Sequence, residues 1–307
     1  MPEVIRTPAD KFKDLLDYPF DPNWYVWSGI RMHYLDQGSK DAPVILCMHG
    51  MPTWSYLYRH MIPILVNKGY RCIAPDCIGF GKSDKVIDDD WYTIERHCRS
   101  MTDLIRHLDL NNITIFVQDW GGPIGLRQVT DMPHRFSRMI IMNTWLHHAE
   151  YQYTQALVNW NHMWQPGNRL AENQITGQVM RAYYRNEVGQ QEVDPGIVKA
   201  YDAPFDGEAS KAGPRQFPRS LPFARPDRGN AVIQSLCFDA LIKWNKPIHF
   251  IWGGKDQVFT TEWGRQWASH FPQATFDEIE DAGHFLQESH GKLVAEIALK
   301  RIAEEGE

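Results

Sequence analysis

An aspartate in the first half of the chain has the surroundings of an attacking group. Ile113–Val117 is a short apolar run rich in β-branched residues, which predicts a buried strand, and a helical pattern begins at about Pro123. Between them, Asp119 stands in a turn that contains Gly121 and Gly122. A strand, a sharp glycine-containing turn and a helix form a nucleophile elbow, which lifts one side chain above a sheet. Asp119 is therefore a candidate nucleophile, and the alternative is that it only caps the helix.

The carboxylate at this position decides which reaction the turn could catalyse. A serine that attacks a saturated carbon would form an ether, which water does not cleave under mild conditions. A carboxylate forms an alkyl ester instead, and water can hydrolyse that ester at the carbonyl carbon of the aspartate itself. Asp119 therefore predicts displacement at an sp3 carbon, with a halide or the oxygen of an opened epoxide as the leaving group.

Two further candidate residues follow strand patterns late in the chain. Pro247–Trp252 predicts a strand shortly before Asp256, and Thr275–Ile279 predicts a strand shortly before His284. Active groups collect beyond the carboxyl ends of parallel strands, so we expect both residues to meet Asp119. His284 would be the general base that activates water, and Asp256 would orient its ring. Taken singly, they could also be a surface histidine and a helix cap, but nucleophile, acid and histidine in this order are expected of α/β-hydrolases.

A second loop has the pattern of an oxyanion hole. Pro43–Met48 predicts a buried strand, and the sequence His-Gly-Met-Pro follows it at residues 49–52. This pattern resembles the oxyanion loop of α/β-hydrolases, in which backbone N–H groups bind developing negative charge. The two N–H groups in this chain would belong to Met51 and Trp120, and we expect His49 to stabilise the turn rather than to act as the base.

The alternation of strands and helices is interrupted once along the chain. It holds to about Trp145 and resumes after about Arg228, whereas the stretch between is rich in Trp, Tyr, Gln, Asn and Pro. We predict an α/β fold of the α/β-hydrolase type, with a mostly parallel central sheet formed by residues 1–145 and 229–307. Residues 146–228 are predicted to form an inserted helical cap domain. Further strands are expected at Ile30–Asp36, Tyr70–Asp76 and Met139–Asn143, and helices at Ile94–Leu108, Thr154–Trp164, Ile175–Tyr184 and from about Gly291 to Glu304.

Composition and charge restrict the class of protein. The 307 residues are 43% hydrophobic and 12% aromatic, which is enough for a sizeable core, and the formal net charge of -6 argues against nucleic acid as a partner. No apolar run is long enough to span a membrane and the N-terminal residues lack a signal-peptide pattern, so we expect a cytoplasmic protein. Five cysteines without a Cys-x-x-Cys pair predict neither a disulfide framework nor a metal site. Gly81-Lys82-Ser83 is not a phosphate loop, because Asp76 stands where that motif needs glycine, and we expect no cofactor.

Several segments of the chain resemble haloalkane dehalogenases. They are HGMPTWSYLYR at residues 49–59, DWGG at residues 119–122 and AGHF at residues 282–285. In the insertion, AYDAPF at residues 200–205 and AGPRQFP at residues 212–218 resemble the cap of the subfamily whose catalytic acid follows the seventh strand. Some relatives place this acid after the strand that precedes the insertion. In this chain that position is at about Asn143, which is not an acid, and this supports Asp256 as the catalytic acid. It implies a small halogenated substrate, a halide product, and a monomer or small homo-oligomer.

The resemblance also implies that two indole N–H groups hold the departing halide. One is Trp120, which follows the nucleophile. The other would be a cap tryptophan, either Trp160 or Trp164, which stand four residues apart on one predicted helix, and we favour Trp160. At position 51 the family usually has Asn, Glu or Gln, whose side chain helps to hold the halide or the water. Met51 departs from this pattern, because its side chain is only a very weak acceptor and donates no hydrogen bond. We therefore expect poorer positioning of water, although the backbone N–H of Met51 remains available for the oxyanion hole.

Two other functions fit the same residues. An epoxide hydrolase would use Asp119, Asp256 and His284 together with two cap tyrosines that donate protons to the epoxide oxygen. The candidate tyrosines are Tyr151, Tyr153, Tyr183, Tyr184 and Tyr201. A non-catalytic relative that only binds ligands would be expected to have lost reacting groups, and this chain retains the nucleophile, the acid and the base.

Overall fold

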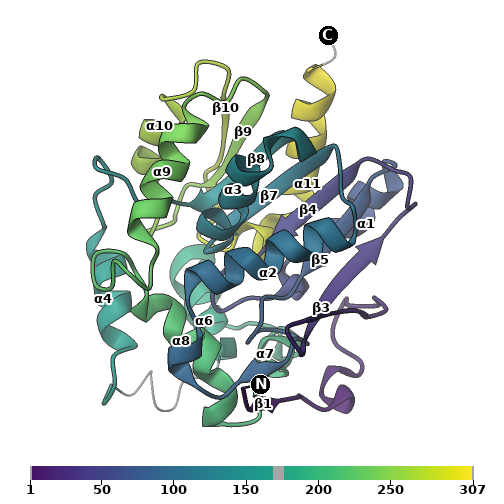
Figure 1. Cartoon of the computed structure of the whole chain (residues 1–307), viewed down its shortest axis with the longest axis vertical. Coiled ribbons are helices and arrows are strands. Elements are labelled where there is room, and N and C mark those ends of the chain that lie inside the picture. The colour runs from purple at the N-terminus through teal and green to yellow at the C-terminus, as the bar shows by residue number, and fades with distance from the viewer. Residues whose placement is uncertain (1, 169–175, 306–307) are drawn as a thin grey trace.

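A computed structural model describes residues 2–168 and 176–305 and contains one large sheet with helices around it (Figure 1). The eight strands of this sheet lie in the order β10-β9-β8-β7-β4-β5-β3-β2, and β1 and β6 form a separate small pair. The strands are β1 (Val4–Ile5), β2 (Asn23–Trp27), β3 (Ile30–Gln37), β4 (Val44–Met48), β5 (Arg71–Pro75), β6 (Lys85–Val86), β7 (Ile113–Asp119), β8 (Phe136–Thr144), β9 (Ile248–Gly253) and β10 (Thr275–Ile279).

The helices fall before, within and after the predicted insertion. The α-helices are α1 (Ile62–Asn67), α2 (Ile94–His107), α3 (Gly121–Asp131), α4 (Gln155–Met163), α6 (Thr176–Tyr183), α7 (Pro195–Asp202), α8 (Ala212–Arg219), α9 (Ala231–Leu241), α10 (Thr261–Ala268) and α11 (Leu286–Glu304). The short helical turns are η1 (Ala9–Phe12), η2 (Ser55–Tyr58), η3 (Asp89–Trp91), η4 (Pro133–Arg135), η5 (Tyr184–Val188) and η6 (Glu208–Lys211). Among the described residues, no helix combines the length and the apolar character needed to cross a membrane.

The order of the strands explains where a site can form. Strand β4 lies between β5 and β7 and pairs with both in parallel, and the chain then continues from β7 through β8 and β9 to β10 in the opposite direction across the sheet. The strand order therefore reverses between β4 and β7, and loops that leave the carboxyl ends of two such strands diverge and leave a crevice. The predicted oxyanion loop follows β4 and the predicted nucleophile ends β7, so the sheet brings these two segments together.

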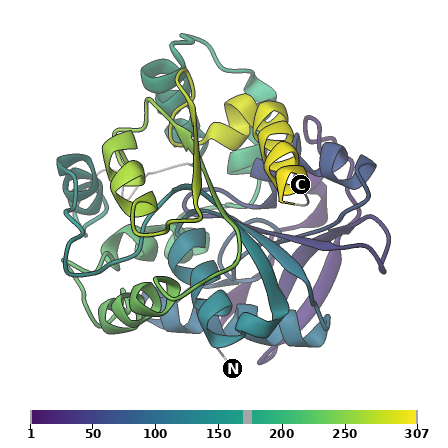
Figure 2. The same ribbon diagram turned by 90° about the horizontal axis from the view of Figure 1, so that it is seen from above.

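Helices cover both faces of the sheet, as the view in Figure 2 shows. Every residue of β4 is buried, which is typical of a parallel strand with a helical layer on each side. Leu46 and Met48 belong to the apolar cluster that includes residues of α2 and α3, whereas Ile45 and Cys47 belong to the cluster that includes residues of α1 and α11. The alternation along the strand thus divides the core into two layers, and the predicted mostly parallel sheet flanked by helices is confirmed.

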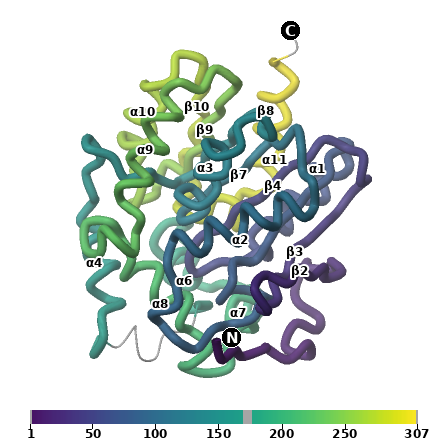
Figure 3. The backbone as a smooth tube through the Cα atoms, viewed as in Figure 1, coloured from purple at the N-terminus to yellow at the C-terminus, as the bar shows by residue number. Residues whose placement is uncertain are grey.

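The segment between β8 and β9 departs from the sheet. Helices α4, α6, α7 and α8 gather below the sheet in the view of Figure 1, and the tube in Figure 3 shows the chain leaving β8, passing through them and returning at α9. Helix α9 packs against α3 of the body. The expected helix at 154–164 corresponds to α4, and the one at 175–184 corresponds to α6, although Ile175 itself lies outside the described residues.

Some boundaries differ from the sequence prediction. Strand β2 was not expected, because its Trp and Tyr residues alternate between half-buried and exposed positions at the edge of the sheet and gave no clear apolar face. Helix α11 begins at Leu286, five residues before Gly291, and contains non-helical backbone at His290 with φ -129° and ψ 24°. The prediction that the terminal helix starts at about Gly291 was therefore wrong. Gly291 is only the start of the second of the two helical pieces that are joined in α11.

Candidate active site

The end of β7 has the backbone geometry of an elbow. Asp119 is the last residue of this strand and has a φ of 51°, in the left-handed region that non-glycine residues seldom adopt. Helix α3 starts two residues later at Gly121, where a Cβ atom would lie 2.2 Å from the carbonyl oxygen of Met48. Only glycine fits so close to the neighbouring backbone. The strained turn and the missing side chain at 121 together place the Asp119 carboxylate above the end of the sheet.

The three residues expected from the sequence order lie next to one another. The Nε2 atom of His284 is 3.6 Å from Oδ2 of Asp119, and its Nδ1 atom is 2.9 Å from Oδ2 of Asp256. All three side chains are largely buried. Because a carboxylate accepts but cannot donate, the bond to Asp256 places a proton on Nδ1 and leaves Nε2 facing Asp119.

Asp256 is held rigidly by neutral donors. Its Oδ1 atom accepts backbone N–H groups of Val258 at 2.6 Å and Phe259 at 3.0 Å, and its Oδ2 atom accepts the side-chain amide of Asn143 at 2.8 Å. Asn143 stands at about the alternative position for the acid that was considered from the sequence resemblance. In this chain, Asn143 therefore supports the acid that follows β9.

The loop after β4 contacts the Asp119 carboxylate directly. The backbone N–H of Met51 donates to Oδ1 of Asp119 at 2.7 Å, and a Cβ atom on Gly50 would lie only 2.1 Å from the same oxygen. His49 uses both ring nitrogens in the turn: Nδ1 donates to the carbonyl oxygen of Gly50 at 2.8 Å, and Nε2 accepts the N–H of Cys77 at 2.9 Å. This arrangement agrees with a turn-stabilising role for His49 and leaves it no free atom for proton transfer.

The charges around His284 raise the pKa of its imidazole. Burial alone lowers that pKa, but the negative charges of Asp256 and Asp119 outweigh it, so the pKa lies well above its ordinary value. A histidine that accepts a proton from water must be neutral at that moment. If Asp119 becomes an ester, its charge disappears and its contribution to the raised pKa is removed. The geometry therefore favours a base that is released for proton transfer only after Asp119 has reacted.

Gln118 is a contact of the base that the sequence did not single out. Its side-chain amide donates to the carbonyl oxygen of His284 at 3.1 Å and lies 3.2 Å from Nε2 of the ring. Once Asp119 has become an ester and the imidazole is neutral, its Nε2 atom can accept this N–H. The only sequence signal was the position of a polar residue in an otherwise apolar strand, immediately before the nucleophile.

A cavity of about 190 Å³ opens beside Asp119 and His284. Its wall is mostly apolar and includes the indole rings of Trp120 and Trp160 as well as the side chain of Met51. Trp120 is buried and stacks on Phe217 of α8 with 5.1 Å between the ring centroids. A small apolar cavity with few polar groups suits a small apolar substrate.

The two tryptophans predicted as candidates for the second halide donor have different surroundings. Trp160 is half-buried and lines the cavity, whereas Trp164 is not among the lining residues and is almost fully buried. The indole nitrogen of Trp164 is buried without a hydrogen-bond partner among the described residues. The rings pack edge to face with centroids 5.5 Å apart. Of the two, only Trp160 lines the cavity, and Trp164 packs against its ring outside the cavity wall.

The tyrosines that an epoxide hydrolase would need do not form a pair of donors in the cavity wall. Of the five candidates, all within the described residues, Tyr183 alone lines the cavity, and its hydroxyl group donates to the carbonyl oxygen of Phe285 at 3.0 Å. The hydroxyl groups of Tyr184 and Tyr201 donate to Glu288, and that of Tyr153 bonds His147. The hydroxyl group of Tyr151 is buried without a partner in the described part of the chain and does not line the cavity. No pair of tyrosine hydroxyl groups converges on Asp119 among these residues.

The cavity wall also contains the carboxyl group of Glu187, which no sequence motif had indicated. Glu187 lies in the π-helical turn η5, and its Oε2 atom accepts the backbone N–H of His284 at 2.6 Å. Burial, reinforced by the negative charge of Asp256, raises the pKa of Glu187 to about 7. Sequence reasoning missed it because the stretch around it has neither a strand nor a regular helical pattern.

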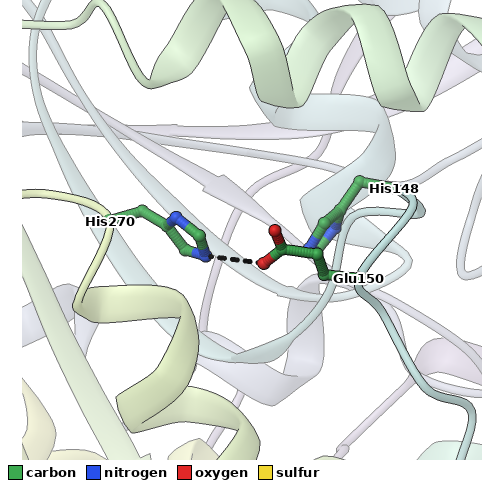
Figure 4. Close-up of side chains that lie close together, drawn as sticks. All are labelled: His148, Glu150 and His270. Carbon is green, nitrogen blue, oxygen red and sulfur yellow. Dashed lines mark ion pairs between the residues drawn. The ribbon is translucent and has the colours of Figure 1, made fainter.

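A cluster of possible metal ligands lies elsewhere. His148, Glu150 and His270 each offer one ligand atom within 4.8 Å of the others, and Figure 4 shows the ion pair between Glu150 and His270. That pair is 3.7 Å long, and His148 stacks on Phe238 with centroids 3.8 Å apart. None of the three residues lines the cavity, so the cluster has no part in chemistry at Asp119.

Comparisons with known proteins agree with this geometry. The family model described as alpha/beta hydrolase fold matches residues 43–291. A haloalkane dehalogenase from Psychrobacter cryohalolentis is 37% identical over 98% of this chain and 98% of that protein, and one from Mycobacterium marinum is 36% identical over 96% and 98%. The solved tetrameric structure of haloalkane dehalogenase DpaA from Paraglaciecola agarilytica NO2 superposes with a TM-score of 0.88 at 35% identity, covering 97% of this chain and 98% of that one. On its motifs, its strand order and these similarities, the chain belongs to the haloalkane dehalogenase family within the α/β-hydrolase fold.

Proposed function

We propose that the protein hydrolyses small haloalkanes to an alcohol and a halide ion through an alkyl ester on Asp119. The observation that carries this proposal is the position of the Asp119 carboxylate, 3.6 Å from Nε2 of His284 and at the wall of a small, mostly apolar cavity. An aspartate nucleophile accounts for displacement at a saturated carbon, and the apolar wall suits an alkyl chain.

In the first step, a free oxygen of Asp119 attacks the carbon that bears the halogen. Oδ1 is already bound by the N–H of Met51, so the attack falls to Oδ2. A carbon–oxygen bond forms while the carbon–halogen bond breaks, and the halide leaves with the bonding electrons. The indole N–H groups of Trp120 and Trp160 would stabilise the negative charge that develops on the halogen. Because indole is neutral, it does not form a permanent ion pair with the Asp119 carboxylate.

In the second step, water attacks the carbonyl carbon of the ester. His284 takes one proton from this water through Nε2, and Asp256 stabilises the imidazolium ion that results. The negative charge then moves to the carbonyl oxygen, where the N–H of Met51 is already placed to receive it. The ester bond breaks and the alcohol leaves with the proton held by His284. The Asp119 carboxyl group then loses the second proton of the water to solvent and is a carboxylate again. The reaction consumes only water and requires no cofactor.

We also propose that residues 146–228 form a cap domain that closes this cavity over the sheet. Three observations support a separate role for this segment: its described residues, 146–168 and 176–228, contain no strand, and it supplies both Trp160 and Glu187 to the cavity wall. Five free, buried cysteines fit a reducing, cytoplasmic compartment. A monomer or small homo-oligomer completes the proposal, and the tetramer of the Paraglaciecola agarilytica relative is one example of such an assembly.

Halide release tests the proposed function. We expect the protein to release bromide from 1,2-dibromoethane and 1-bromobutane at mildly alkaline pH, in proportion to enzyme concentration. An epoxide of similar size should remain unhydrolysed under the same conditions, because paired tyrosine donors are not aimed at Asp119. Folded protein that opens the epoxide and leaves both bromoalkanes intact would overturn the proposal in favour of epoxide hydrolysis.

The roles of the cap tryptophans can be separated by one matched pair of variants. Trp160→Phe keeps an aromatic ring in the cavity wall but removes the N–H donor, so alkylation should slow by roughly a hundredfold, as for the loss of one donor to a developing charge. Trp164→Phe removes a buried N–H that faces no cavity and should leave alkylation within about threefold of the unmodified protein. Rapid-quench measurement of bromide release gives the alkylation rate directly. A larger effect at Trp164 than at Trp160 would show that the donor is assigned to the wrong residue.

A further inference from the structure

Glu187 is the one acidic group of the cap in the cavity wall, among the described residues, and the reaction steps above leave it unused. It stands in η5, a five-residue π-helical turn that continues directly from α6. A π-turn holds an extra residue compared with an α-helical turn, and this shifts which side chain faces inward. Here the side chain that turns inward is a half-buried carboxyl group rather than an apolar one.

The contact between Glu187 and the base is closely fitted. Oε2 of Glu187 accepts the backbone N–H of His284 at 2.6 Å, which joins a residue of the predicted cap to the loop that follows β10. Gly283 makes room for this contact, because a Cβ atom there would lie 2.2 Å from the same Oε2 atom. Any other residue at 283 would displace the carboxyl group. The glycine and the acid therefore form one arrangement that fixes the main chain of His284.

The charges that face Glu187 come from the body of the protein. Asp256, after β9, raises the pKa of Glu187 through its negative charge, and His284, after β10, lowers it through its positive charge and its N–H group. On the cap side, the hydroxyl group of Tyr183 is bound to Ser289 and Phe285 and remains neutral in the same pH range. Glu187 is thus electrostatically linked to the imidazole and its acid partner, in addition to the main-chain bond.

We infer that Glu187 is a positioning residue for the hydrolytic step, which holds the main chain of His284 from the cap and stabilises the imidazolium ion with its charge. The inference rests on the proposed function, because it assigns Glu187 to the second of the two steps. No substrate atom has to touch Glu187 for this role. It also offers a polar group at the site in a chain whose residue 51 is an apolar methionine.

The two steps of the reaction should respond differently to Glu187→Gln. Glutamine has the same shape and can still accept the N–H of His284, but it carries no charge. The alkylation of Asp119, seen as a burst of bromide from 1-bromobutane, should keep its rate within about twofold. Hydrolysis of the ester should slow by about threefold to tenfold, because the imidazole becomes a weaker base without the nearby carboxylate. Glu187→Ala also removes the main-chain acceptor and should slow hydrolysis further.

The pH profile separates this role from a purely structural one. A nearby negative charge raises the pKa of an imidazole, so its removal should lower the pKa of His284 in the alkylated enzyme. The acidic limb of the hydrolysis rate should therefore move to lower pH in Glu187→Gln, by about half a unit or more, while the plateau falls. A variant that only loosens the fold would lower the plateau without moving the limb.

A matched control and a burst measurement make the outcomes distinct. Glu192→Gln removes an exposed charge of the same segment that does not line the cavity, and it should behave like the unmodified protein. If Glu187→Gln hydrolyses the ester at the unmodified rate with an unmoved acidic limb, the inference is wrong and the proposed function stands. If the unmodified protein releases no bromide at all, the proposed function itself has failed.

Discussion

Replacing His284 with phenylalanine is expected to stop the reaction after one turnover, with the alkyl group left on Asp119. The first step uses the Asp119 carboxylate and the halide donors, and none of these depends on His284. The second step needs a base at Nε2, and loss of a positioned general base slows a reaction by about a hundredfold to ten-thousandfold. Phenylalanine fills a similar volume, so the aromatic contacts of His284 with Phe259 and Phe285 are largely kept.

Mass spectrometry of the digested variant measures this result. After incubation of His284→Phe with 1-bromobutane, the peptide that contains Asp119 should carry one butyl group, and bromide should appear in an amount equal to the enzyme. Unmodified protein treated in the same way is the control and should show continued bromide release with little adduct. Bromide turnover by the unmodified protein, together with an unmodified Asp119 peptide in the variant, would contradict the assignment of the two steps.

Asp119→Asn is expected to abolish halide release, to below about one part in a thousand of the unmodified rate. An amide oxygen is a poor nucleophile, so the ester cannot form. The halide donors then have no departing halide to stabilise, because the carbon–halogen bond is not broken. Asparagine is the better substitution because Asp119 has a φ of 51°, a conformation that asparagine adopts far more readily than alanine does. We expect Asp119→Ala to lose activity as well, but also to lower thermal stability through strain at this turn.

The measurement is bromide release at saturating substrate, with the melting temperature recorded for each variant. The intact mass of Asp119→Asn must be checked throughout, because hydrolysis of its amide would regenerate the aspartate. Trp164→Phe serves as a control for a conservative change in a nearby buried side chain. Residual halide release by intact, folded Asp119→Asn at about a tenth of the unmodified rate or more would point to direct attack by water.

The parts of the site that could be predicted are those where local sequence dictates the backbone. Gly121 and Gly122 after an apolar strand require a tight turn, and the turn fixes Asp119 at the strand end. The strand before Asp256 is a short, mostly apolar run, whereas the strand before His284 is more polar, and parallel pairing of the two brings their ends to the same edge of the sheet. Asp119, Asp256 and His284 lie close together because the strands that precede them end at the same edge of the sheet. The order of the motifs along the sequence had indicated this arrangement.

The rest depends on packing between segments that are distant along the chain. Trp160 and Trp164 lie on the same side of one helix, so periodicity could not distinguish them, and only the contact with α8 and the cavity gives them different exposure. Glu187 faces the site because η5 is irregular and packs against Gly283, and no local pattern predicts such a turn. Strand β2 was missed because pairing with β3, rather than its own apolar pattern, holds it in the sheet.

Met51 is the clearest departure from the residue types that the sequence resemblance led us to expect, and the structure limits what it changes. Its backbone N–H still binds Asp119 at 2.7 Å, so the oxyanion contact does not depend on the side chain. The buried methionine side chain adds apolar wall to the cavity instead of a polar group. We therefore expect any deficit to appear in the hydrolytic step, where Gln118 and Glu187 are the remaining polar neighbours of His284.

The most direct test of the ester on Asp119 is a single turnover of 1-bromobutane in water enriched in oxygen-18, with enzyme in excess over substrate. The proposed sequence predicts that the butanol carries an ordinary oxygen, taken from Asp119, and that the Asp119 peptide gains one heavy oxygen from water. Heavy oxygen in the butanol and none in the Asp119 peptide would show that water attacks the substrate directly. That result would contradict the central claim, whatever the rate of bromide release.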